Sequence, residues 1–129
     1  MGWLLKDFNF SGIYLTTSFP SPQYQGILIF TKKVRDISQG PGRSTPLWGV
    51  LDAIAVERLK PGEDFSGGTC EFKGKGEEIA LAAVVKIQGH EEKEKFEELR
   101  KAWLLNSQTG KIEVVPTEKV ACINIGLGV

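Results

Sequence analysis

One segment of the chain is apolar almost without interruption, and it reads Ile79-Ala80-Leu81-Ala82-Ala83-Val84-Val85-Lys86-Ile87. A strand with one face in water alternates apolar and polar residues, whereas a strand buried on both faces is apolar throughout. The segment therefore predicts a central β-strand that is covered on both faces.

Short apolar runs surround this segment. Glycine and proline separate the runs, a pattern that favours strands over long helices. Residues 12–19 and 26–31 are rich in β-branched and aromatic side chains, and they predict two neighbouring antiparallel strands. Residues 102–105 and 111–115 predict a hairpin, because the polar loop between them ends in a glycine.

The glycines of residues 73–78 predict another hairpin, which would join residues 67–72 to the apolar segment 79–87. A last strand is expected over residues 120–125.

Residues Leu47–Leu59 fit two structures. A helix would have Thr45 as its N-cap and Pro46 at its first position. A strand suits the β-branched side chains of the run and Gly49 within it. We favour the strand.

Residues Glu91–Lys101 have the charge pattern of a surface helix. Glutamates occupy the first turn and Arg100 and Lys101 the last, as the helix dipole prefers. Two acid-before-base pairs stand four residues apart, Glu91 with Lys95 and Glu97 with Lys101. The pattern predicts one helix that packs on the outside of the strands.

These elements predict an α+β fold class. We expect an antiparallel β-sheet or a small, partly open β-barrel with one surface helix at about Glu91–Lys101. The chain has 129 residues, the size of one domain, and residues 1–129 are expected to form a single globular domain.

The charge and hydropathy of the chain limit the classes of partner and the location that we expect. Sixteen basic residues balance sixteen acidic ones. Since non-specific nucleic-acid binding needs a surplus of Lys and Arg, no nucleic acid partner is expected. No run approaches the roughly 18 apolar residues of a membrane span, so no membrane partner is expected. The N-terminal residues lack the pattern of a secretion signal and favour a cytoplasmic location. A periplasmic or secreted chain whose leader has been removed would look the same.

His90 is the only histidine, and it lies in a charged run. Zinc sites with two histidines and carboxylate–histidine relays need imidazoles that this chain lacks. We therefore expect no metal site, no cofactor and no catalytic residue.

Cys70 and Cys122 are too far apart for a Cys-x-x-Cys motif. Both lie in runs that read as strands, where a free cysteine is usually a small buried apolar residue. Two buried thiols are the first interpretation. A disulfide between Cys70 and Cys122 is the second, and it would indicate an oxidising compartment.

One loop could bind an anion or a small ligand. Its candidate residues supply close backbone approach, a guanidinium and two hydroxyls, and they are Gly40, Gly42, Arg43, Ser44 and Thr45. The loop lacks the Gly-Lys-Ser/Thr ending of a phosphate-binding loop, and a plain surface loop explains it as well.

The sequence thus predicts a small, non-catalytic binding or protein-interaction module of unknown ligand. Its expected partner is another protein or a second copy of the chain, bound through a strand edge or through residues Trp3–Leu5. Two alternatives stay open. The first is an enzyme with a pocket around Asp52, Cys70 and Arg43, and the second is an exported domain cross-linked by a Cys70–Cys122 disulfide.

Overall fold

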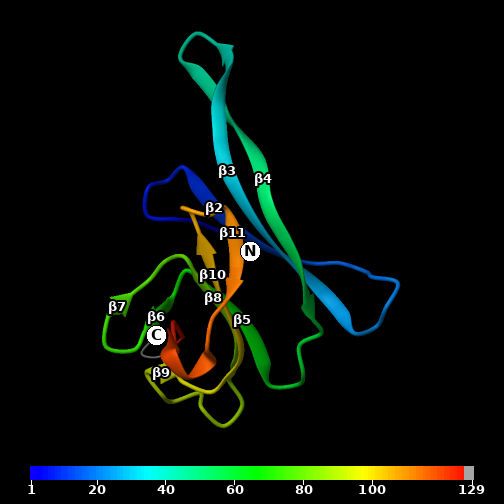
Figure 1. Ribbon diagram of the computed structural model, residues 1–129, viewed down its shortest axis with the longest axis vertical. Helices are drawn as coiled ribbons and strands as arrows, with labels where there is room; N and C mark the ends of the chain where they lie inside the picture. Colours follow the sequence, from blue (N-terminus) through cyan, green and yellow to red (C-terminus); the bar gives the residue numbers. More distant parts are fainter. Residues whose placement is uncertain (127–129) are drawn as a thin grey trace.

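The computed structural model describes residues 1–126, which form three antiparallel sheets of four strands each (Figure 1). Sheet A has the strand order β1-β2-β3-β4. Its strands are β1 (Gly2–Leu4), β2 (Phe10–Thr16), β3 (Tyr24–Gly40) and β4 (Arg43–Glu57).

Sheets B and C are built from the second half of the chain. Sheet B has the order β11-β10-β8-β5 and sheet C the order β7-β6-β12-β9. The strands of sheet B are β5 (Glu63–Gly67), β8 (Leu81–Lys86), β10 (Leu99–Asn106) and β11 (Lys111–Val114). The strands of sheet C are β6 (Cys70–Phe72), β7 (Gly76–Glu77), β9 (Lys95–Phe96) and β12 (Val120–Ile123), with a 3₁₀ turn, Thr117–Lys119, before the last.

Sheet B is the middle layer. In its central strand β8, Ala82 and Val84 pack into an apolar cluster shared with sheet A. Leu81, Ala83 and Val85 point the other way, into a cluster shared with sheet C. All five side chains are at most 1% exposed. The prediction of a central strand covered on both faces is confirmed.

Several other sequence predictions are also confirmed. Residues 12–16 pair antiparallel with residues 26–30, as β2 and β3. The hairpin at residues 103–106 and 111–114 is present as β10 and β11. The favoured strand over Leu47–Leu59 is β4, which ends at Glu57.

The predicted α+β fold class is wrong, because residues 1–126 contain no α-helix. The expected surface helix Glu91–Lys101 is instead a pair of turns, the short strand β9, and the start of β10. The side-chain amide of Asn124 donates hydrogen bonds to the carbonyl oxygens of Glu91 and Lys93, so these carbonyls have partners without a helix.

Burial of apolar side chains explains why this segment forms strands and not a helix. As strands, this segment pairs Phe96 with Cys122 and Leu99 with Val85, which buries Phe96 and packs Leu99 against the apolar cluster shared with sheet C. Full burial of one large apolar side chain contributes about 1.5–3 kcal/mol. An exposed acid–base pair four residues apart contributes only about 0.2–0.5 kcal/mol.

The hairpin expected between residues 67–72 and 79–87 has different partners. β6 pairs with the short β7 and with β12, whereas β8 pairs with β5 and β10. The glycines of residues 73–78 do form a tight turn, with Gly74 and Gly76 at positive φ. The apolar segment passes beyond that turn into sheet B, where sheets A and C cover both faces of β8.

A disulfide joins Cys70 of β6 to Cys122 of β12, where the two residues are direct partners in the strand register. Both cysteines are fully buried. Of the two interpretations of the cysteines, the structure contains the disulfide and not a pair of free thiols.

Trp3 connects sheet A to sheet B through a slot lined by glycines. Its ring lies over Gly12 of β2 and over Gly67 and Gly68 beside β5. Its indole nitrogen donates a hydrogen bond of 2.8 Å to the carbonyl oxygen of Ile79. The sequence predicts residues Trp3–Leu5 as an interaction end. In the structure Trp3 and Leu5 pack inward, whereas Leu4 is 44% exposed.

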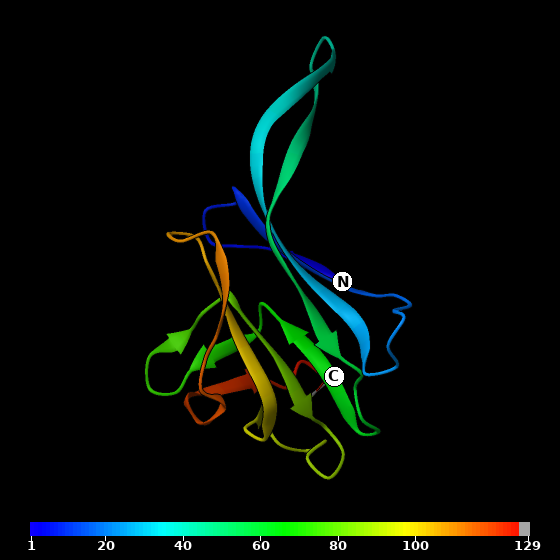
Figure 2. The ribbon, with the colours of Figure 1, turned by 45° about the vertical axis from the view of Figure 1, so that its right-hand side comes forward.

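β3 and β4 are much longer than the other strands. Beyond the body of the molecule they continue together as a twisted, two-stranded projection (Figures 1 and 2). We call residues 32–49 the arm. The described part of the chain has no helix with the length and hydropathy needed to cross a membrane.

The glycine slot predicts a steric effect. In a Gly12→Ala variant, the new Cβ would lie 2.5 Å from the Trp3 ring, which cannot retreat because Gly67 and Gly68 hold its other edges. We expect the free energy of unfolding to fall by about 1–3 kcal/mol, the cost of overpacking a core. Gly2→Ala is the matched control, since its Cβ would lie 3.5 Å from the nearest atom. Equal urea-denaturation midpoints for the two variants would contradict this account.

The disulfide predicts a second effect on stability. It closes a loop with a sequence separation of 52 residues. Chain entropy for such a loop corresponds to about 4 kcal/mol. The Cys70→Ala/Cys122→Ala variant should lose about that much free energy of unfolding relative to the oxidised protein, measured by chemical denaturation. An unchanged stability would show that the cross-link constrains nothing in the unfolded chain.

Candidate interaction surface

The two faces of sheet A have different surroundings. Strand register places Trp3, Gly12 and Phe30 side by side, and Tyr14 beside Leu28. These residues face sheet B, where Tyr14 stacks on Phe65 with ring centroids 4.0 Å apart. Because side chains alternate between the faces of a strand, the residues between them belong to the opposite face, which we call the outer face.

The outer face consists of three rows across the strands, which the pairing of residues defines. The rows are Leu4-Ser11-Thr31-Val50, Gly2-Ile13-Ile29-Ala53 and Leu15-Ile27-Ala55. None of these side chains carries a charge. The two polar side chains, Ser11 and Thr31, are buried and hydrogen-bonded to each other, so the face is aliphatic in character.

Much of this aliphatic surface is open to solvent. Leu4 is 44% exposed, Leu15 is 47% exposed and Val50 is 68% exposed. The isoleucines of the face are half-buried among their neighbours. An antiparallel sheet with one solvated face normally presents polar side chains there. Contiguous exposed aliphatic surface is a common feature of faces that bind another molecule.

The sequence contains a signal for this surface within residues 26–31, where the sequence analysis predicts only a strand. Ile27-Leu28-Ile29-Phe30 is apolar at every position, the same signature that identifies β8 as covered on both faces. In β8 both covering layers come from the chain itself. In β3 the inner side chains Leu28 and Phe30 are fully buried within the chain, whereas the outer side chains Ile27 and Ile29 keep part of their surface in solvent.

The candidate ligand loop lies at the tip of the arm. Gly40 and Arg43 are the last residue pair of the β3–β4 hairpin, and Gly42 in the turn has a positive φ of 71°. Arg43, Ser44 and Thr45 are exposed. The loop is a hairpin turn that projects from the body, and within the described residues no second element lies against it to complete a pocket.

The structure does not bring Asp52, Cys70 and Arg43 together. Cys70 is in the buried disulfide and Arg43 is at the arm tip. The Asp52 carboxylate accepts a hydrogen bond of 2.8 Å from the backbone of Ile112, so it ties β4 to β11 across sheets A and B. These three residues have separate environments and do not form a common pocket.

His90 belongs to a structural pair. Its Nε2 atom lies 2.9 Å from the carboxylate of Glu98, in the region where the helix was expected. The hydrogen bond from His90, together with the charge of Lys86, lowers the pKa of Glu98 below its ordinary value. Among the described residues, no group of three or more His, Cys, Asp or Glu side chains is arranged to hold a metal ion.

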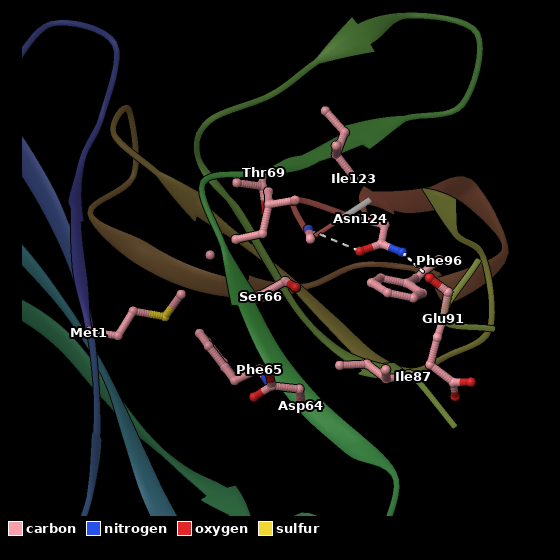
Figure 3. A pocket seen from close by; sticks show the side chains of 13 residues that line it. Met1, Asp64, Phe65, Ser66, Thr69, Ile87, Glu91, Phe96, Ile123 and Asn124 are labelled. Carbon is pink, nitrogen blue, oxygen red and sulfur yellow. Dashed lines mark hydrogen bonds between the residues drawn. The ribbon is translucent and has the colours of Figure 1, made fainter. Parts of the chain in front are cut away.

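A hollow of about 480 Å³ lies where sheets A, B and C meet, between Met1, β5 and residues 123–126 (Figure 3). Its polar groups serve the backbone. Asp64 accepts a hydrogen bond from the N–H of Phe65, and Glu91 accepts one from Gly89. Asn124 donates to two carbonyl groups of the neighbouring turn. These polar side chains thus bind nearby backbone groups, and no two of them form a reactive pair.

The outer face of sheet A is therefore the best-defined candidate site in the molecule. Comparison of the chain with protein-family models, with curated proteins and with solved structures finds no match.

Proposed function

We propose that this protein is a non-catalytic interaction module that self-associates through the outer face of sheet A. The observation that supports the proposal is the uncharged, aliphatic character of that face across all four strands, with Leu4, Leu15 and Val50 in solvent. Burial of such surface contributes roughly 25 cal/mol per Å², and no charged group of the face has to be desolvated first.

A second copy of the chain is the partner that fits this surface. A face without charges gives a charged partner nothing to pair with, whereas an identical aliphatic face matches it. Two sheets can pack face to face about 10 Å apart, with interleaved side chains, as in a β-sandwich. A two-fold axis generates such a contact from a single surface and closes it at a dimer.

The disulfide supports a proposal about location. Disulfides persist in oxidising environments and are rare where thiols are kept reduced. We therefore prefer the exported alternative, a periplasmic or secreted chain, to the cytoplasmic location expected from the sequence.

Self-association is tested by the change in apparent mass with concentration. In analytical ultracentrifugation from about 1 µM to about 100 µM, the wild-type protein should pass from monomer to dimer. Leu15→Lys places a charge in the centre of the contact, and Val50→Lys places one at its margin. Each variant should weaken the dimer at least about a hundredfold.

Val114→Lys is the matched control. Val114 is 63% exposed, as solvent-accessible as Val50, but it belongs to β11 of sheet B and lies outside the outer face. This variant should dimerise like the wild type. A wild-type protein that stays monomeric over the whole series would contradict the proposed function, and equal effects of all three lysines would show that the contact is not the outer face.

Location is tested on protein isolated from its native host. After denaturation and alkylation without reductant, the intact mass should show no alkyl group on Cys70 or Cys122. Two alkyl additions would mean free thiols in the cell and would contradict the exported location.

A further inference from the structure

Charge is distributed unequally along the molecule. The arm carries Lys32, Lys33, Arg35 and Arg43 against Asp36 alone, a surplus of three positive charges. Asp36 is itself paired with Lys33, at 3.7 Å. Arg35 and Arg43 are exposed.

The opposite end of the molecule is acidic. We call residues 57–64 and 86–98 the acidic end; they contain eight acidic and five basic side chains, and Arg100, whose guanidinium binds Glu57 and Glu63, leaves a net charge of −2 there. Backbone hydrogen bonds from Ile87 and Gln88 to the carbonyl oxygen of Gly62 hold the two segments together. In Figure 2 the arm is at the top and the turns of residues 86–95 are at the bottom. The arm and the acidic end therefore have opposite net charges.

The acidic end also lies beside the end of sheet A that is farthest from the arm. β4 ends at Glu57, whose carboxylate is 3.3 Å from the guanidinium of Arg100. The same guanidinium binds Glu63 at 2.9 Å. Burial alone would raise the pKa of Glu63, but the hydrogen bonds from Arg100 and the Lys60 backbone, together with the charges of Arg100 and Lys60, lower the pKa. The outer face is therefore flanked by positive charge at one end and negative charge at the other.

Two-fold packing of outer faces allows two arrangements. With the axis parallel to the strands, both arms project from the same end, and like charges lie side by side. With the axis across the strands, the arms project from opposite ends, and each arm extends past the acidic end of the partner copy. The four large side chains in the middle of the face, Ile13, Leu15, Ile27 and Ile29, then form the centre of the contact and face the same four residues of the other copy.

We infer that the dimer takes the second arrangement, in which the arm of each copy docks toward the acidic end of the other. The inference rests on the proposed self-association and adds its geometry. The arm runs from the pair Lys32–Gly49 to the pair Gly40–Arg43, so it is on the order of 25 Å long, enough to reach beyond the body of a partner.

The apolar residues of the arm support the same occupant. Val34 is 63% exposed, and Ile37 and Leu47 are each 38% exposed. A two-stranded hairpin without a packing layer is marginally stable in water. A second copy would cover these side chains and supply opposite charge to the arm's arginines.

A pair of charge-reversed variants tests the inference. The arm variant is Arg35→Glu/Arg43→Glu, and the acidic-end variant is Glu92→Lys/Glu94→Lys. Each homodimer would have like charges at both docking positions, and its dissociation constant should rise on the order of tenfold. In an equal mixture, both positions of the heterodimer have opposite charges. Native mass spectrometry should therefore show the heterodimer as the dominant dimer.

Matched controls carry the same charge changes on other parts of the surface. Lys73→Glu/Lys75→Glu and Glu77→Lys/Glu118→Lys lie outside the arm and the acidic end, and they should dimerise like the wild type. Raising the salt concentration should weaken the wild-type dimer, because the Debye length falls from about 10 Å at 0.1 M to about 3 Å at 1 M.

The outcomes separate the two proposals. If Leu15→Lys breaks the dimer but both charge-reversed variants dimerise normally, the arm inference is overturned and the outer face stands. A monomeric wild type overturns the proposed function and the arm inference with it. A double-stranded DNA probe is the third test. If the arm variant loses salt-sensitive binding of that probe while its self-association is unchanged, the arm is a polyanion site and the inference is wrong.

Discussion

The structure depends on the burial of β8 on both faces. Its alternate side chains enter two different apolar clusters, one with sheet A and one with sheet C. Only a layer on each side can keep both sets out of water. This requirement makes sheet B the middle layer and makes sheets A and C the outer ones. It also leaves sheet A with a second face, on which Leu4, Leu15 and Val50 are exposed to solvent.

A few particular side chains connect the layers. Trp3 fits a slot where Gly12 and Gly67 leave room for its ring, and Asp52 binds the backbone of β11. On the other side of sheet B, the disulfide joins the two strands that cover β8. These contacts fix the orientation of sheet A, so its aliphatic outer face and its arm have a defined relation to the acidic end.

The sequence predicted the strands well where a local pattern decides the structure. The uninterrupted apolar run of residues 79–87 identified the central strand, and β-branched content gave β2, β3 and β4. The helix at Glu91–Lys101 was wrong because its charge pattern is a local signal worth tenths of a kcal/mol per pair. The competing burial of Phe96 against sheet C and the pairing of Leu99 with β8 depend on where those strands lie, which no local window contains.

The candidate site, too, could be predicted from the sequence only in part. The outer face could have been predicted from Ile27–Phe30, since a strand that is apolar at every position needs cover on both sides. The opposite charges of the arm and the acidic end could not, because a balance of sixteen acids and sixteen bases conceals them until the fold separates the arm from residues 57–64 and 86–98. The glycines of residues 40–45 suggested a ligand-binding loop, and in the structure they form the turn of a hairpin.

The central claim is that the outer face of sheet A is covered by a second copy. Methyl NMR with a soluble paramagnetic agent measures this cover directly at Leu15 and Val50, with the exposed Val114 as an internal reference. On concentration of the protein, the paramagnetic relaxation of the Leu15 and Val50 methyl groups should fall, while that of Val114 stays constant. If all three residues remain equally accessible at every concentration, the outer face is not an interface between copies.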